Sequence, residues 1–224
     1  MLYMLSSKSN VSPDPRDLST CKVMSMTSGT PNTRDAILTA TKALVESTSF
    51  ADVSLARVAA DAGVSRQAVY LHFGSRTGLL LALVAWMDET GRLRSLMDPV
   101  LKLDDPAEVL LGSIAAATAY NADVAAVSLA LREARRSDEA AAAAWNDLRA
   151  ARIAAIRSVV TPVANSGGLR PGWNVRLATD MIYAMISPTM YEDLVIDRKW
   201  SQRRYTDHVV RLVRGMLAGD PADE

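Results

Sequence analysis

The chain has few of the side chains on which most enzyme and metal chemistry depends. Its 224 residues include one cysteine, Cys21, and two histidines, His72 and His208. A single cysteine excludes an internal disulfide and a cysteine-cluster metal site. The sequence also has no phosphate-binding glycine loop, no nucleophile elbow and no cluster of metal-ligand residues. These absences predict a protein that is not an enzyme and that needs no metal or cofactor.

Long apolar runs and aromatic residues are also scarce. The uncharged stretches 77–87 and 109–122 are shorter than the roughly 20 residues that cross a membrane as a helix. The first residues lack the basic leader and long apolar core of a signal peptide. We therefore expect a cytoplasmic location and no membrane partner. Aromatics make up 5% of the chain and alanine is abundant, which favours helices over sheets.

What the sequence does contain is a helix-turn-helix pattern in the stretch 54–80. A first short helix ends at Gly63, where a left-handed backbone conformation has little steric cost. Ser65 can cap a second helix, and the apolar residues Val69 and Phe73 fall on its inner side. The outer face of this second helix is left to Arg66, Gln67, Ala68 and Tyr70.

This outer face suits the major groove of DNA, because Arg and Gln can make paired hydrogen bonds to base edges. The net charge of the chain is zero, which argues against a nucleic-acid partner. The local balance of charge is different. Positions 57–76 contain three positive residues, Arg57, Arg66 and Arg76, and one negative residue, Asp61. An ordinary amphipathic surface helix would show the same short motif, so the motif alone leaves both interpretations open.

The wider pattern resembles the DNA-binding region of the TetR (tetracycline-repressor) family of bacterial regulators. The run LARVAADAGVSRQA is followed by VYLHFGSRTGLL, and the resemblance extends from Thr33 to about Glu89. It implies that Arg66, Gln67 and Ala68 contact bases and that the capping Ser65 belongs to the same DNA-binding site. It also implies that four residues contact phosphates: Ser54, Tyr70, His72 and Arg76. Gly74 and Gly78 depart from the family pattern and predict a loosened joint between the DNA-binding region and the rest of the chain.

We therefore predict an all-α fold with three parts. Residues 1–31 are expected to be a disordered extension, residues 32–76 a helix-turn-helix DNA-binding domain, and residues 77–219 a helical effector-binding and dimerisation domain. Phe50 and Val53 should close the core of the first domain. The apolar periodicity of the second domain predicts helices over 77–96, 106–120, 121–135 and 138–164, one broken at Pro188, and a last one from about Ser201.

The last two amphipathic helices can bury their apolar stripes internally or against a second copy. The family resemblance favours a homodimer, which would use Leu177, Met181, Met185, Val209, Leu212, Val213 and Met216. An effector pocket in the body has a candidate lining of Trp86, Met97, Tyr120, Leu129, Trp145, Met181 and Met185, and core packing is the alternative role of each.

Together these patterns predict a transcriptional regulator. We expect a homodimer that binds a palindromic operator in double-stranded DNA and is released by a small, largely apolar effector of unknown identity. An activator would use the same mechanism at a differently placed operator. The main alternative is a helical interaction or ligand-binding protein of the same fold that no longer binds DNA.

Overall fold

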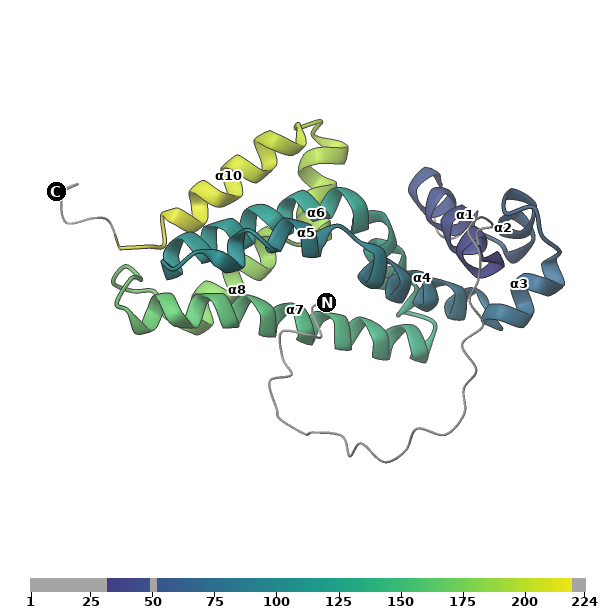
Figure 1. Cartoon of the computed structure of the whole chain (residues 1–224), viewed down its shortest axis with the longest axis horizontal. Helices are drawn as coiled ribbons and strands as arrows, with labels where there is room; N and C mark the ends of the chain where they lie inside the picture. Colours follow the sequence, from purple (N-terminus) through teal and green to yellow (C-terminus); the bar gives the residue numbers. More distant parts are fainter. Residues whose placement is uncertain (1–31, 49–51, 219–224) are drawn as a thin grey trace, which may run out of the picture.

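The computed structural model describes residues 32–48 and 52–218. Within these ranges the regular structure is helical, apart from one isolated bridge between Leu169 and Leu217. A small group of helices, α1 to α3, forms one end of the molecule, and α4 joins it to a longer helical bundle (Figure 1). The all-α prediction is confirmed. The expectations for the extension 1–31 and for Phe50 lie outside the described residues.

The first three helices form the head, defined here as residues 32–48 and 52–75. They are α1 (Thr33–Ser47), α2 (Leu55–Asp61) and α3 (Arg66–Phe73), and each begins after a side chain that caps it. Asn32, Ser54 and Ser65 accept hydrogen bonds from backbone N–H groups in the first turns, which would otherwise lack partners. The core of the head contains Ile37, Leu38, Val53, Val58 and Val69, all almost fully buried.

Helix α4 (Arg76–Thr90) runs from the head into the body and buries Leu79, Leu80 and Leu83. The prediction of one helix over 77–96 is wrong at its end. Helix α4 stops before Gly91, and a separate helix, α5 (Leu93–Met97), follows. A β-carbon at Gly91 would lie 2.5 Å from the Tyr120 hydroxyl oxygen, so another helix occupies the space that a side chain would need. A short 3-10 turn, η3 (Val100–Lys102), follows.

The body is built around one long central helix, α6 (Pro106–Ala134). The sequence predicted two helices here, 106–120 and 121–135, but no glycine or proline interrupts the chain at that point and the helix continues. By length and composition alone α6 could cross a membrane, contrary to the expectation from its uncharged stretches. It packs instead against α4, α5, α7, α9 and α10, as the central helix of a helical domain does.

The remaining helices surround α6. Helix α7 (Glu139–Asn165) continues through Pro162, which lies in its last turn. Helix α8 (Val175–Met185) is followed by the short α9 (Pro188–Tyr191) and a π-helical turn, η4 (Glu192–Asp197), neither of which the apolar periodicity predicted. Helix α10 (Gln202–Arg214) completes the body.

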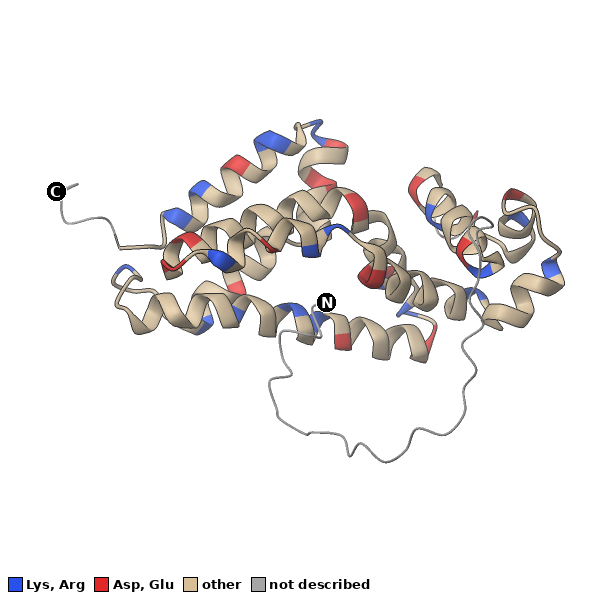
Figure 2. Cartoon of the chain, viewed as in Figure 1, with Lys and Arg blue, Asp and Glu red and all other residues tan. Residues whose placement is uncertain are grey.

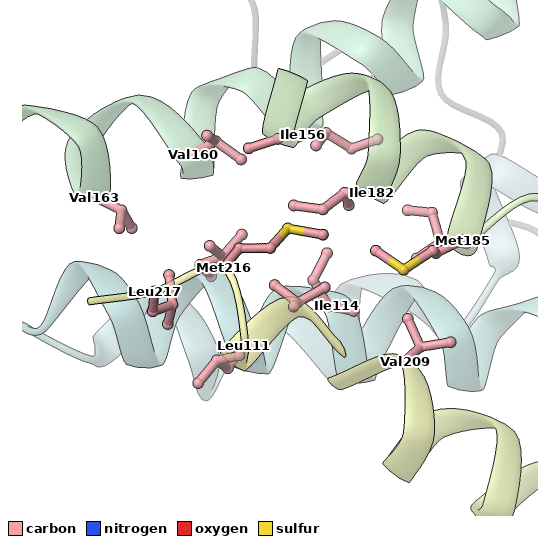
Figure 3. Close-up of a cluster of buried hydrophobic side chains, with 14 of the residues drawn as sticks. Leu111, Ile114, Ile156, Val160, Val163, Ile182, Met185, Val209, Met216 and Leu217 are labelled. Atoms are coloured by element: carbon pink, nitrogen blue, oxygen red, sulfur yellow. The ribbon is translucent and has the colours of Figure 1, made fainter. Parts of the chain in front are cut away.

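The body core lies between α6, α7, α8 and the end of the chain. Figure 3 shows Ile156, Val160 and Val163 of α7 facing Leu111 and Ile114 of α6, with Met216 between them. Met216 and Leu217 belong to this core although they follow the last residue of α10. The apolar residues predicted for the last helix therefore reach the core partly through the irregular segment after α10. The backbone N–H of Arg170 donates to the Met216 carbonyl at 3.0 Å and holds this segment in place.

Candidate nucleic-acid interface and internal cavity

Helix α3 presents a polar face to solvent at the end of the molecule. Arg66, Gln67 and His72 are exposed, and Tyr70 is 60% exposed. Val69 is fully buried, so the inward and outward sides of α3 are those expected from the sequence. The second predicted inward residue is only half-buried, and sequence reasoning also missed an exposed apolar residue: Leu71 is 77% exposed at the centre of this face.

Ala68 is the third residue predicted to contact bases. It is half-buried, and its N–H donates to the Ser65 hydroxyl at 3.1 Å. The Ser54 hydroxyl accepts from the Arg57 N–H at 3.2 Å in the same way. Each hydroxyl uses an acceptor position for the cap and keeps its own hydrogen, which can still be donated to a phosphate.

The turn between α3 and α4 is tight. Gly74 has a φ of +69°, which favours glycine, and the Ser75 hydroxyl caps α4 by accepting from the Gly78 N–H at 2.9 Å. A β-carbon at Gly78 would lie 2.1 Å from the Phe73 carbonyl oxygen. The two glycines were expected to loosen this joint. In the structure Gly74 provides the left-handed backbone of the turn, and Gly78 allows a close approach to the Phe73 carbonyl that a larger residue would prevent.

A hydrogen bond links the start of α4 to the start of α7. The Thr77 hydroxyl donates to Asp138 Oδ2 at 2.7 Å, and Asp138 Oδ1 accepts from the Ala141 N–H at 3.0 Å as the cap of α7. The Ala141 N–H, followed by the Thr77 hydroxyl, holds the pKa of the Asp138 carboxyl below its ordinary value. The first turn of α4, which follows the head directly, is therefore joined to α7 through a charged capping group.

A cavity of about 140 Å³ lies inside the body between α4, α5, α6 and α7. Most of its wall is apolar, with Met87 from α4, Met97 from α5, Val124 from α6 and Leu148 from α7. The polar residues at its wall are Asp88, Ser113, Tyr120, Asn121, Ser128 and Arg152. Two of the cavity's residues, Ile114 and Ile156, also appear in the body core (Figure 3).

Two predicted pocket residues, Met97 and Tyr120, line this cavity, and the other five do not. Trp86 packs against the hydrophobic cluster that joins the head to α4 and α6. Leu129 lines a separate hollow near α1 and α9. The Trp145 ring lies under the Arg135 guanidinium, with the carbon 5.6 Å from the ring centroid. Met181 is exposed and Met185 belongs to the body core. Periodicity identified apolar helix faces but not the place where neighbouring helices leave space.

Several polar groups beside the cavity have partners in the protein. The Tyr120 hydroxyl donates to the Met87 carbonyl at 3.3 Å, and burial, then the charges of Asp88 and Asp123, raise the pKa of Tyr120 to about 12. Asn121 Nδ2 donates to the Ile186 carbonyl at 3.1 Å. Burial also raises the pKa of Asp88. Asp88, Asn121 and Arg152 were not predicted as cavity residues, because nothing in the sequence distinguishes them from other polar residues on amphipathic helices.

The seven residues predicted for a dimer interface separate into two groups. Leu177, Met181 and Leu212 are 41%, 43% and 55% exposed. The other four are buried in the chain's own core and are not accessible to a partner in this conformation: Met185, Val209, Val213 and Met216. Figure 2 shows several positive residues and a negative one along α10. Arg211 and Arg214 lie in its last turn, near Leu212 in the sequence. Of the three exposed residues, Leu177 and Met181 lie on α8 and Leu212 lies on α10.

Comparison with known proteins agrees with this geometry. Residues 37–83, which include α2, α3 and most of α1, match the family model of bacterial regulatory proteins of the tetR family. The match covers the helix-turn-helix region, so this region resembles that of TetR-family regulators. No curated protein sequence matches it.

Solved structures of TetR-like fold resemble the chain over nearly their whole length. FadR from Bacillus subtilis, in complex with stearoyl-CoA, is 21% identical, with a TM-score of 0.65 over 82% of this chain and 98% of that one. PfmR, a TetR-family regulator from Thermus thermophilus, is 21% identical with a TM-score of 0.65, over 85% and 98% of the two chains. NalD from Pseudomonas aeruginosa is 22% identical with a TM-score of 0.63, over 84% and 98%. At these identities the likeness establishes a shared fold.

Proposed function

We propose that this protein is a ligand-responsive repressor of the TetR family that binds a palindromic operator as a homodimer and is released by a small molecule. One observation carries the proposal: α4 connects the two candidate sites. Its first residue, Arg76, lies beside the exposed face of α3, and its residues Val84, Met87 and Asp88 line the cavity. A helix of 15 residues spans about 22 Å, so a ligand that shifts its far end also shifts the head.

The DNA-binding part of the proposal is supported by the exposed face of α3. Arg66, Gln67, Tyr70 and His72 are exposed on this face. In the proposed complex, Arg66 and Gln67 contact base edges, and Tyr70 and His72 contact the backbone. FadR is described with a bound acyl-CoA, and NalD is described as a repressor of a multidrug efflux pump. Both descriptions are consistent with a ligand-controlled repressor.

A dimer is needed because one short recognition helix contacts few base pairs. Each good contact supplies about 1–3 kcal/mol of discrimination, which is too little to select one site in a genome. The exposed side chains Leu177, Met181 and Leu212 offer a surface for a second copy. The two heads would then contact half-sites roughly 34–36 Å apart, or a multiple of that distance.

Selection of bound sequences from a random pool of duplex DNA tests this function. We expect an enriched palindrome. Arg66→Ala should relax the preference at one position in each half-site and weaken specific binding by about 1–3 kcal/mol. Arg76→Ala should weaken binding to all sequences alike and reduce its salt dependence. Arg157→Ala, an exposed arginine on α7, is the control and should change neither. Recovery of no enriched motif at low salt would refute the proposal.

A further inference from the structure

Arg152 is a half-buried cation at the wall of the cavity, and the described part of the chain provides no hydrogen-bond or ion-pair partner for its guanidinium. Within residues 32–48 and 52–218, no carboxylate lies within 4.0 Å of its guanidinium, and the guanidinium makes no hydrogen bond. Two other arginines of the body, Arg92 and Arg132, have partners. Arg92 Nε lies 2.6 Å from Asp123 Oδ2, and Arg132 Nη1 donates to the Thr189 hydroxyl at 2.9 Å.

An unpaired guanidinium in such a place costs stability, since its donors lose water without gaining acceptors. Burial lowers the pKa of Arg152, while the nearby phenols of Tyr183 and Tyr205 act in the opposite direction. Arginine stays charged at neutral pH, so the positive charge remains in the cavity wall. Costly polar groups that nothing in the fold satisfies are characteristic of binding sites.

The rest of the cavity limits what can pair with this cation. Its wall is predominantly apolar, with Met87, Met97 and Leu148 among its residues. Its volume, about 140 Å³, is close to that of engineered apolar cavities of about 150 Å³ that bind benzene. A ligand that fits without expansion therefore has an apolar body about the size of one aromatic ring. Larger ligands would require the surrounding helices to move apart.

We propose that the cavity binds a small amphipathic molecule with one oxyanion, a carboxylate or a phosphate, and that Arg152 is the residue that recognises this anion. The planar guanidinium can donate two parallel hydrogen bonds to either group. This inference rests on the proposed function, whose effector it refines from largely apolar to apolar with a single negative charge. Asp88 of α4 lines the same cavity, so a negative charge delivered there acts on the helix that carries the head.

The proposal is tested by measuring the binding of three probes to the DNA-free protein at matched ionic strength. The probes are benzoate, phenyl phosphate and neutral benzamide. We expect benzoate or phenyl phosphate to raise the melting temperature in a concentration-dependent way and benzamide to have at most a tenth of that affinity. The anion that binds identifies carboxylate or phosphate as the recognised group. Arg152→Gln should weaken anion binding at least tenfold, whereas Arg149→Gln, an exposed arginine on the same helix, should not. Equal binding of benzamide, no binding of either anion, or full binding by Arg152→Gln would overturn the proposal.

A second measurement needs no ligand. Arg152→Met keeps an unbranched side chain that reaches about as far as the Arg Nε atom and removes the unpaired charge. The ligand-free protein should therefore melt at the same or a higher temperature than the parent. A clear fall in melting temperature, with Arg149→Met unchanged, would show that Arg152 supports the fold and would overturn its assignment to a ligand. Neither measurement involves DNA, so failure to find an operator would refute the proposed function without affecting these results.

Discussion

Tyr205→Phe removes one hydroxyl from the point where three helices of the body meet. Tyr205 is fully buried on α10, its hydroxyl donates to the Met185 carbonyl at 2.9 Å, and it accepts from Asn121 Nδ2 at 3.3 Å. Phenylalanine fills the same ring volume, so packing is preserved. The Met185 carbonyl lies in the last turn of α8, where no intrahelical donor exists, and it would lose this partner.

The expected loss of stability follows from this geometry. Leaving a buried acceptor without its donor costs about 1–3 kcal/mol. At about 3 °C per kcal/mol for a chain of this size, the melting temperature should fall by roughly 3–9 °C. Asn121 Nδ2 keeps its bond to the Ile186 carbonyl at 3.1 Å, so the loss should stay within this range.

Urea unfolding at a fixed protein concentration measures the effect, with the midpoint shifted and the slope unchanged. Tyr183→Phe is the matched control. Tyr183 is half-buried on α8 and forms no hydrogen bond within the described part of the chain, so its change should be within about 0.5 kcal/mol. Equal stabilities for the two variants would refute the assignment of the Tyr205 hydroxyl to this three-helix junction.

The same residue predicts a pH dependence. Burial, partly offset by the Asn121 hydrogen bond, raises the pKa of Tyr205 to about 12. The unfolded chain releases this proton near pH 10, before the folded chain does, so folding is favoured below pH 10 and loses this contribution as the pH rises toward 12. Tyr205→Phe should therefore lose less stability between pH 10 and pH 12 than the parent.

Three further predictions concern the head, the capping carboxylate and the dimer. Gly63→Ala should lower the free energy of unfolding in urea by about 1–2 kcal/mol, because Gly63 has a φ of +67°. A β-carbon there would meet no neighbouring atom, so the cost comes from the backbone alone, and Gly63→Asn should cost less. Equal costs for the two variants would contradict this reasoning. Because hydrogen bonds lower the pKa of Asp138, stability should fall as the pH drops below about 4, and Asp138→Asn should flatten that fall. Met181→Glu with Leu212→Glu should convert a species of twice the 24.2 kDa chain mass into a monomer in sedimentation, and a dimer that persists would contradict the surface proposed here.

The head was largely predictable because its signals are local. Ser54 and Ser65 cap helices through hydrogen bonds to residues three positions later, and Gly63 adopts a left-handed conformation that its own sequence position requires. Val69 is buried as its helical spacing indicated. Each of these features depends on a few neighbouring residues, and a single sequence contains that information.

The body was less predictable because its features depend on which helices meet. Gly91 ends α4 next to Tyr120 of α6, about thirty residues further along the chain. Met185 was predicted for both a ligand pocket and a dimer interface, and it is buried in the chain's own core. Helical periodicity indicates that such a residue faces an apolar surface, but the surface of a neighbouring helix, a ligand and a second copy all produce the same pattern.

The sequence by itself determined the helical class, the capped helices of the head and the outward face of α3, because propensity, capping and periodicity act within a few residues. Only the tertiary structure decided where the cavity lies and that Arg152, one arginine among several on α7, is at its wall without a partner among residues 32–48 and 52–218. The physical reason is that a cavity and an unpaired charge are defined by what neighbouring elements leave unfilled, and that depends on packing between residues far apart in the chain.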